Sequence, residues 1–290
     1  MSEQVEVTRL GVVGCGLMGS GIVEVAARAG LDVLVREIDA RAVEAGQQRV
    51  TSSLDRGVKR GKLSAEDRDA AWSRIAFTTD LGDFGDRQLV IEAIAENEQL
   101  KADIFATVDK VVESPDAIFA SNTSSIPIMK LGMATSRPEQ VIGIHFFNPV
   151  PVLPLVELVP SLLTAEATKQ AATAFVTGPL GKQVITSQDR AGFIVNALLI
   201  PYLLSAIRMF ESGFASAADI DQGMVLGCSH PMGPLALCDL IGLDTTKAVA
   251  ESMYDEFKEP LYSSPPLLAR MVDAGLLGKK SGRGFHDYRG

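Results

Sequence analysis

Histidine is the side chain best suited to proton transfer near neutral pH, and the 290-residue chain has three: His145, His230 and His286. His145 lies at the end of the apolar run Val141–Phe146, and open α/β sheets place their ligands at the carboxyl ends of strands. An imidazole there can accept a hydroxyl proton while a hydride leaves the same carbon. A histidine at a strand end is at least as often structural, so this chemistry needs a second group.

The second group is Glu157, which interrupts the otherwise apolar segment Val152–Val159. A carboxylate within such a strand needs a partner, because burying an unpaired charge is expensive. If this strand neighbours the one that carries His145, Glu157 can orient the imidazole and stabilise its protonated form. The alternative is a surface glutamate on an edge strand.

A third candidate is the polar run Ser121–Ser125, which follows the apolar segment Ala117–Ala120. Hydroxyl and amide groups at a strand end can hold a substrate oxygen or a cofactor. The alternative is that the run caps a helix over Ile126–Leu131. Both interpretations can hold for different residues of the run.

A glycine pattern near the N-terminus indicates a dinucleotide site. It follows the apolar strand Arg9–Val13 and precedes a helical pattern that runs to Arg28. In this context the first glycine permits a tight turn, and the second lets a pyrophosphate approach the backbone. The third lets helix and strand pack closely, and the helix N-terminus offers N–H groups to the phosphates. The loop residues expected at the cofactor are Gly14, Gly16, Leu17, Met18 and Gly19.

The acid after the second strand, Glu37, indicates which cofactor binds. A carboxylate there can accept both ribose hydroxyls of NAD and would repel a 2′-phosphate. Arg36 beside it can instead pair with the 2′-phosphate of NADP, so NAD is favoured and NADP stays open. Asp39 is expected to be the N-cap of the next helix. Cys15 is expected to be a small residue that fills the glycine turn, with a redox switch as the alternative.

These groups must be positioned by a pattern in which strands alternate with helices. Helical stretches, including Glu98–Val112 and Ala165–Phe175, separate most of the strands. The alternation predicts an α/β fold with a Rossmann-type, doubly wound and mostly parallel sheet. Strands are expected at Arg9–Val13, Asp32–Val35, Ile75–Thr78, Leu89–Ala93, Ala117–Ala120, Val141–Phe146, Leu155–Val159 and Gln183–Thr186.

Two further regions are predicted to be helical. Residues 40–73 form a charged insertion between the second and third strands, and interruptions at Gly57 and Gly61 predict a helical hairpin. After about Thr186 the pattern becomes all-helical, with helices at Ala191–Glu211, Ala217–Leu226, Pro234–Glu256 and Pro265–Ala274. We therefore predict a cofactor-binding domain over residues 1–187 and a helical domain over residues 188–290.

Composition argues against several classes of function. A formal charge of −9 without a basic run is typical of proteins that do not bind nucleic acid. No apolar run is long enough to span a bilayer, and the polar start Met1–Thr8 is unlike a signal peptide. Cys15, Cys228 and Cys238 are few and not at metal spacing. We therefore expect no metal site, no membrane or nucleic-acid partner, and a cytoplasmic location.

Several stretches together resemble the L-3-hydroxyacyl-CoA dehydrogenase family, in particular bacterial 3-hydroxybutyryl-CoA dehydrogenases. The resemblance runs from about Leu10 to Tyr288. It is carried by GVVGCGLMGSGI, VIEAIAENEQLK, ASNTSSIPI, GIHFFNPVPVLPLVELV, DRAGFIVNALLIPYL, HPMGPL, GLDTTK and GKKSGRGF. It implies an oxidoreductase that interconverts a 3-hydroxyacyl-CoA, of short chain length, and the 3-oxoacyl-CoA by hydride exchange with NAD.

The resemblance also implies roles for single residues. His145 would be the catalytic base with Glu157 as its partner, Ser124 would contact the substrate hydroxyl, and Asn196 would approach the substrate from the second domain. The family's acid after the second strand is commonly Asp, so Glu37 adds a methylene and leaves the ribose geometry in doubt. Residues implied near the cofactor are Ala93, Glu96, Lys101, Asn122 and Asn148.

The helical regions also take expectations from the resemblance. The insertion would help to cover the CoA, which makes Arg56, Lys59 and Lys62 candidates for contacts with its phosphates, with ordinary solvated charges as the alternative. The second domain would bind substrate and pair two copies as a homodimer.

Two other functions remain open at this point. One is a dehydrogenase of free 3-hydroxy acids or sugar acids on the same fold. The other is a non-catalytic NAD-binding protein, against which the set His145, Glu157, Ser124 and Asn196 argues, since a structural role needs none of them.

Overall fold

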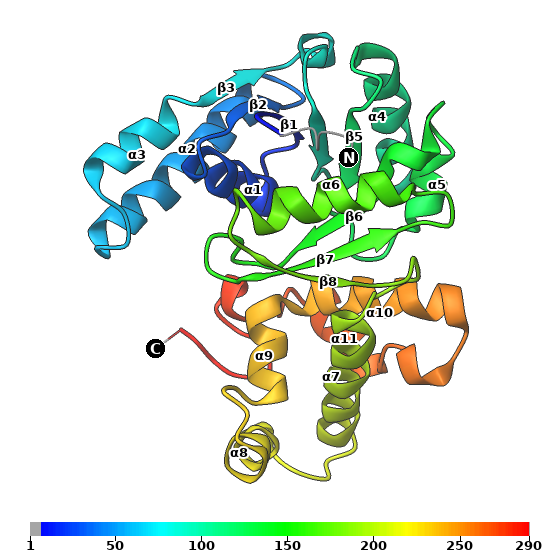
Figure 1. Cartoon of the computed structure of the whole chain (residues 1–290). Helices are drawn as coiled ribbons and strands as arrows, with labels where there is room; N and C mark the ends of the chain where they lie inside the picture. Colours follow the sequence, from blue (N-terminus) through cyan, green and yellow to red (C-terminus); the bar gives the residue numbers. More distant parts are fainter. Residues whose placement is uncertain (1–6, 290) are drawn as a thin grey trace. The chain divides into compact units, whose positions relative to one another are not determined.

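The computed structural model describes residues 7–289, and most of the polar start Met1–Thr8 lies outside them. Within these residues an eight-stranded sheet has the order β3-β2-β1-β4-β5-β6-β7-β8 (Figure 1). Each neighbouring pair of described strands is parallel except β6 and β7. The predicted doubly wound sheet is confirmed. The strands are β1 (Arg9–Val13), β2 (Asp32–Arg36), β3 (Ile75–Thr78), β4 (Leu89–Glu92), β5 (Ile118–Ser121), β6 (Val141–Phe146), β7 (Leu155–Pro160) and β8 (Gln183–Thr186).

The strand order reverses beside β1, which pairs with β2 on one side and β4 on the other. Loops that leave the carboxyl ends of β1 and β4 therefore diverge, and such a crevice is where open α/β sheets bind ligands. The glycine turn follows β1, and Ala93 follows β4. The fold thus brings the two segments to one point.

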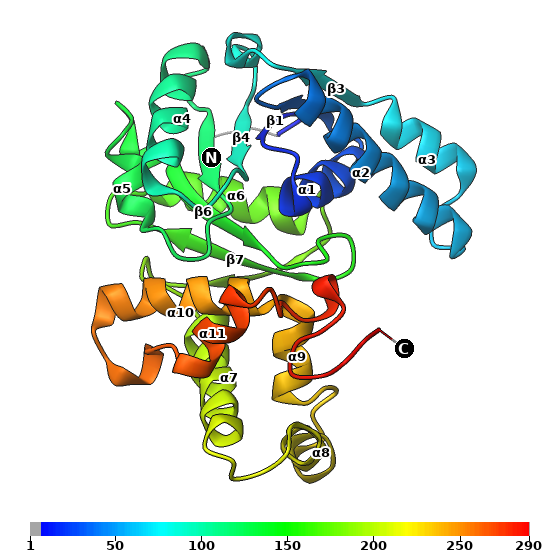
Figure 2. The same cartoon turned by 180° about the vertical axis from the view of Figure 1, so that it is seen from behind.

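Helices cover both faces of the sheet. Helices α1 (Leu17–Arg28) and α6 (Glu166–Thr177) contribute Ile22, Val23 and Phe175 to a core with one face of the strands (Figure 1). Helices α4 (Glu98–Val111) and α5 (Ile128–Gly132) contact each other, and α4 lies in front in Figure 2.

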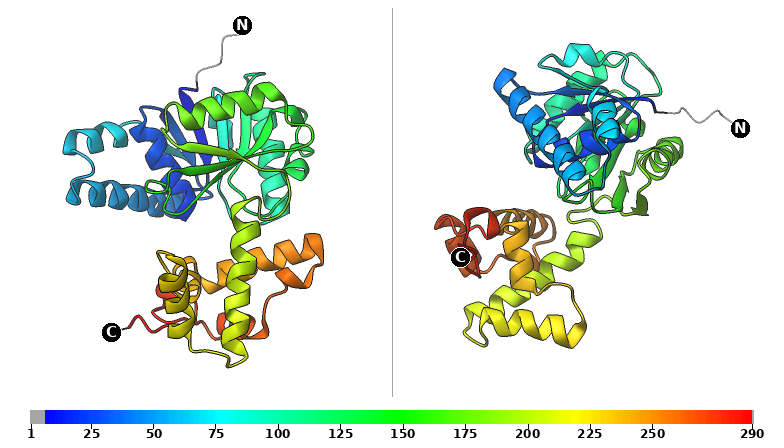
Figure 3. Two further views of the ribbon diagram at one scale, coloured as in Figure 1. Left: turned by 60° about the horizontal axis from the view of Figure 1, so that its bottom comes forward. Right: turned by 90° about the vertical axis from the view of Figure 1, so that its left-hand side faces the viewer.

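The insertion after β2 is the predicted helical hairpin, but one predicted interruption is wrong. Helix α2 (Ala40–Lys59) runs through Gly57, and α3 (Ala65–Trp72) packs beside it (Figure 3). A glycine within a helix costs about 1 kcal/mol relative to alanine, which a long helix with Val50 and Leu54 in the core tolerates. As predicted, Asp39 caps α2 by accepting a hydrogen bond from the Ala42 amide at 2.7 Å.

The described chain divides into two compact units, and the second begins at Ala191. This second unit is helical and has its own apolar core, which includes Leu203, Leu235 and Met253. Its longer helices are α7 (Val195–Glu211), α8 (Ala217–Cys228), α9 (Pro234–Ile241), α10 (Leu243–Phe257) and α11 (Pro266–Asp273). None of the helices in residues 7–289 combines the length and apolar character needed to cross a bilayer.

Two helix predictions in this unit are wrong, and positive backbone φ angles explain both. The helix expected from Ala191 begins at Val195, because Gly192 (φ 82°) and Phe193 (φ 46°) have left-handed backbone conformations. The single helix expected over Pro234–Glu256 is two helices separated by Gly242, at φ 104°. A glycine adopts this conformation at little cost, so it ends α9 cleanly.

Candidate active site

His145 and Glu157 lie directly opposite each other on β6 and β7. His145 Nδ1 is 2.8 Å from Glu157 Oε2, Glu157 is fully buried, and the His145 residue is 7% exposed. Strand β7 lies between β6 and β8, so the alternative of a surface glutamate on an edge strand is wrong. A buried carboxylate bonded to an imidazole is an acid–base pair that can store or release one proton.

The polar run after β5 is held by Glu96. Its Oε1 accepts hydrogen bonds from Thr123 Oγ1 at 2.5 Å, Ser125 Oγ at 2.9 Å and the Ser124 amide at 3.1 Å. These bonds fix the backbone of Ser124 at the carboxyl end of the sheet. The Asn122 side chain accepts a bond from the Phe146 amide at 2.9 Å, which ties this loop to the strand of the histidine.

The alternative role of this run, capping a helix from Ile126, holds in part, because Thr123 Oγ1 accepts hydrogen bonds from the Ser125 and Ile126 amides at 3.2 and 2.9 Å and so caps the turn before the helix. Helix α5 begins at Ile128 without a cap from the preceding residues. Its first amides, of Ile128 and Met129, donate instead to the two carboxylate oxygens of Asp189 at 2.7 and 2.8 Å. The hydroxyls of the run are therefore not needed to cap α5.

The glycine loop leaves room for a ligand at one position and is tightly packed at the other two. A Cβ at Gly19 would lie 1.9 Å from the Gly14 carbonyl oxygen, and a Cβ at Gly14, where φ is 94°, would lie 2.9 Å from the Ala93 carbonyl oxygen. A Cβ at Gly16 would meet nothing within 4 Å. The loop is thus held close to β4, and open space above its second glycine suits a pyrophosphate.

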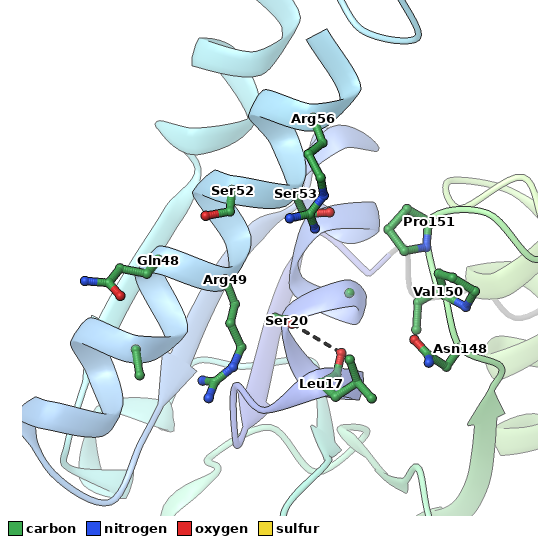
Figure 4. A pocket seen from close by; sticks show the side chains of 13 residues that line it. Leu17, Ser20, Gln48, Arg49, Ser52, Ser53, Arg56, Asn148, Val150 and Pro151 are labelled. Carbon is green, nitrogen blue, oxygen red and sulfur yellow. Dashed lines mark hydrogen bonds between the residues drawn. The ribbon is translucent and has the colours of Figure 1, made fainter. Parts of the chain in front are cut away.

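A groove of about 490 Å³ runs beside this loop (Figure 4). Helix α1 forms one side with Leu17, Ser20 and Gly21, α2 forms the second, and the segment Asn148–Pro151 after β6 forms the third. Side chains of α2 that line it are Gln48, Arg49, Ser52, Ser53 and Arg56. Two guanidinium groups along an otherwise neutral groove suit an anionic ligand.

Comparisons with known proteins place nearly the whole chain in one family. Residues 9–190 match the sequence profile of the "3-hydroxyacyl-CoA dehydrogenase, NAD binding domain", and residues 192–288 match that of the C-terminal domain. The chain belongs to the 3-hydroxyacyl-CoA dehydrogenase family. This confirms the resemblance, and with it an oxidoreductase that uses NAD.

Three relatives of this dehydrogenase illustrate its similarity. A 3-hydroxybutyryl-CoA dehydrogenase of Mycobacterium tuberculosis is 59% identical over 99% of this chain and 100% of its own. The crystal structure of (S)-3-hydroxybutyryl-CoA dehydrogenase from Ralstonia eutropha is 46% identical, with a TM-score of 0.92 over 98% of this chain and 100% of that one. A diketoreductase structure is 27% identical, with a TM-score of 0.86 over 98% and 100%.

In this dehydrogenase, Lys101 lies deeper than its predicted place near the cofactor suggests. It is 1% exposed, and its Nζ is 2.6 Å from Glu92 Oε1 and 3.3 Å from Glu96 Oε2. Burial alone raises the pKa of the Glu96 carboxyl, but Lys101 and the hydrogen bonds from the Ser124 loop outweigh it and lower that pKa below its usual value. Lys101 therefore holds Glu96 ionised as an acceptor for the loop.

Glu37 lies beside the glycine loop of the dehydrogenase. Its Oε1 accepts a hydrogen bond from the Cys15 amide at 2.5 Å, and its Oε2 accepts one from the Ile38 amide at 3.2 Å. Arg36 donates from Nε to the Thr79 carbonyl at 3.4 Å. The carboxylate, and not the guanidinium, is thus bonded to the loop, as expected for NAD.

The remaining predicted residues are distributed over several parts of the dehydrogenase. Leu17 lines the groove, whereas Met18 packs against the hydrophobic core. Arg56 lines the groove, Lys59 does not, and Lys62 lines a second groove. Asn196 is half-buried in the first turn of α7, in the helical unit.

Three residues that build or support the site were not identified from the sequence. Glu92 closes a buried strand, so the argument used for Glu157 would also have required a cation for it. Arg49 lies seven residues before Arg56, the spacing that brings residues to one face of a helix. Asp189 gave no signal, since its partners are amides distant in the sequence.

Cys15 is an unreactive thiol in this structure. It is fully buried, and burial, with a smaller effect of Glu37, raises its pKa to about 12. Burial likewise raises the pKa of Cys238 above its usual value, whereas Cys228 is exposed. Because the thiolate is the reactive form, the redox-switch alternative for Cys15 is not supported.

We therefore expect one of the three cysteines to react in the native protein. A chromogenic disulfide reagent at pH 8 should titrate one thiol, that of Cys228, and all three after unfolding in guanidinium. Rapid reaction of a second thiol, together with loss of NADH binding, would contradict the packing of Cys15.

Proposed function

We propose that the protein interconverts an (S)-3-hydroxyacyl-CoA of short chain length and the 3-oxoacyl-CoA, with His145 as general acid–base and Glu157 as its partner. The buried 2.8 Å contact between these two side chains carries the proposal. The 59% identity to a 3-hydroxybutyryl-CoA dehydrogenase supports the chain length.

The mechanism follows from the two ring nitrogens. With Nδ1 bonded to Glu157, Nε2 is the nitrogen that exchanges a proton with the substrate hydroxyl. The Glu157 carboxylate stabilises the imidazolium that forms as the hydroxyl becomes a carbonyl. Ser124 holds the substrate oxygen, and Asn196 contacts the substrate from α7. When bound, NAD supplies the hydride acceptor.

The cofactor is held by the loop after β1 and the loop ends beside it. Glu37 accepts the ribose hydroxyls, and the space above Gly16 takes the pyrophosphate. Ala93, Glu96, Asn122 and Asn148 line the nicotinamide side. Lys101 acts through Glu96.

Gly16 offers a clean test of this assignment. Gly16→Ala should weaken NADH binding about tenfold, roughly 1.4 kcal/mol, because the new methyl occupies space that the pyrophosphate needs. The melting temperature should stay at the wild-type value, because the Cβ meets nothing in the protein. NADH fluorescence titration and differential scanning fluorimetry measure the two quantities.

Gly19→Ala is the contrasting variant. Its Cβ would overlap the Gly14 carbonyl, so the protein itself should be destabilised. Unchanged NADH affinity in Gly16→Ala would place the pyrophosphate elsewhere.

For the CoA, we propose that Arg49 and Arg56 contact its pyrophosphate from the groove beside α1. Lys59, on the same helix, is a weaker candidate.

Oxidation of NADH with acetoacetyl-CoA, compared with free acetoacetate, tests the reaction. A second candidate, reduction of dicarbonyl compounds without CoA, is favoured by the similarity to a diketoreductase. Faster turnover of acetoacetate would select that candidate.

We also propose a cytoplasmic homodimer that pairs through the helical unit. Large apolar side chains are exposed on this unit, with Leu198, Phe214 and Leu226 each more than 70% exposed. Pairing of two copies would remove such side chains from water. The three free cysteines suit a reducing compartment. Light scattering should give the mass of a dimer of the 30.9 kDa chain, and a monomer would contradict the proposal.

A further inference from the structure

A second groove in the sheet unit is larger than the one described above and has no role in the proposed reaction. Its volume is about 660 Å³, within the range of small-molecule sites. It lies among the C-terminal end of α1, helix α3 and the segment Pro179–Lys182 before β8. Four cationic side chains line it: Arg28, Lys62, Arg74 and Lys182.

The positive charge of this groove is only partly balanced. Arg28 pairs with Glu24 at 3.3 Å, and one carboxylate, Asp67, lies in the lining. Lys62 and Arg74 have no ion-pair partner among residues 7–289. In a chain with a formal charge of −9, such a concentration of cations is a local feature. It attracts anions through the charges of these side chains alone, and the partial negative charge at the C-terminal end of α1 opposes that attraction.

Lys182 connects this groove to the one beside the glycine loop. Its Nζ donates to the carbonyls of Val150 and Leu153, both at 2.7 Å, and so shapes the segment that lines the first groove. These bonds use two of its three N–H groups. Burial and the nearby Arg28 lower the pKa of Lys182 below its usual value. A bound anion would relieve this repulsion between neighbouring cations.

The rest of the lining is apolar. Leu63, Ala71, Pro179 and Leu180 offer a surface on which a planar ring can lie, close to the cations. Phosphates beside an apolar ring surface are the chemistry of a nucleotide. A bare inorganic anion would use the charges and leave the apolar part unfilled.

We infer that this groove binds the phosphate groups of an adenine nucleotide. The nucleotide is either the adenosine 3′-phosphate of the acyl-CoA substrate, with the pyrophosphate of the same molecule in the first groove, or a free nucleotide such as ATP. The first source fits the layout, because α1 lines the first groove near its start, with Leu17, and the second near its end, with Arg28, while Pro151 lines both. Helix α1 thus connects them over about 18 Å. In this first form the inference rests on the proposed function.

The test reverses one charge that the proposed reaction does not use. Arg74→Glu removes an exposed cation from the second groove, and Arg74→Lys keeps the charge. Lys110→Glu makes the same change of charge on α4, outside both grooves. Melting temperatures show whether each variant is folded, and Arg74→Gln replaces the reversal if it is not.

Two measurements on each variant distinguish the two sources. Steady-state assays give KM for acetoacetyl-CoA and for acetoacetyl-pantetheine, which lacks the nucleotide. Calorimetric titrations with ATP, run with saturating NAD to occupy the cofactor site, give the affinity for a free nucleotide.

If the groove binds the nucleotide end of CoA, Arg74→Glu should raise KM for acetoacetyl-CoA about tenfold and leave KM for acetoacetyl-pantetheine unchanged. If the groove binds a free nucleotide, Arg74→Glu should leave both KM values unchanged and lower the affinity for ATP about tenfold. In either case Arg74→Lys and Lys110→Glu should resemble the wild type. Equal effects in Arg74→Glu and Lys110→Glu, or no effect on either ligand, would overturn the inference. Turnover of acetoacetyl-pantetheine by the wild type tests the proposed reaction separately.

Discussion

Replacing His145 with glutamine should lower kcat for acetoacetyl-CoA reduction by about 10²–10⁴-fold, the usual contribution of a positioned general acid–base. Glutamine keeps much of the side-chain volume and can still bond to Glu157, but it cannot carry a proton to the substrate oxygen. NADH affinity should stay at the wild-type value, because the glycine loop follows a different strand. Stopped-flow single turnovers and NADH fluorescence titration measure the two effects.

His230→Gln is the matched control for this prediction. His230 contacts Tyr202 in the helical unit at 3.2 Å, and nothing in the proposed reaction requires it. Its variant should keep wild-type turnover. Near-normal activity of His145→Gln would contradict the assignment, and a parallel loss of NADH binding would point to a disrupted sheet instead.

The second large effect is expected from Glu157→Gln, with a loss of about 10²–10⁴-fold in kcat. The amide fills the same space but has no charge, so the imidazolium formed during oxidation is no longer stabilised. An amide N–H can also donate to Nδ1, which would favour the wrong tautomer of His145. The protein should remain folded, because the glutamine amide can still hydrogen-bond to His145 and leaves no cavity.

Nitrogen-15 NMR of labelled histidine distinguishes an effect on His145 from a general loss of structure. In the wild type Nδ1 should carry the proton bonded to Glu157, and in Glu157→Gln the proton should move to Nε2. Glu157→Asp retains the charge but lies further from the ring, so it should recover part of the activity. Wild-type turnover with an altered tautomer would contradict the proposed role of Glu157.

Several site residues were predictable because their chemistry is local. Glu157 sits in an apolar run, and the cost of an unpaired buried charge was enough to expect a partner. Gly14, Gly16 and Gly19 carry their function in their spacing. The structure adds a difference among them, since two glycines avoid collisions within the protein and Gly16 leaves open space for a ligand.

Other residues could not be placed from the sequence because their partners are distant along the chain. Lys101 resembled a cofactor contact, and only the structure places it in a buried pair with Glu92. Asp189 caps a helix that begins some sixty positions earlier in the chain. Gly57 was predicted to interrupt a helix and Gly242 to lie inside one, and the structure shows the reverse.

The sequence by itself determined the doubly wound sheet, the helical unit after it, the dinucleotide loop and the family. These depend on periodicity, glycine spacing and ordered motifs, which are properties of short segments. Only the tertiary structure decided that His145 faces Glu157 at 2.8 Å and that Lys101 is buried against Glu92. It also decided that Lys62 lines a second, cationic groove. Pairings of this kind depend on strand order and helix packing, which bring together residues that no local pattern relates.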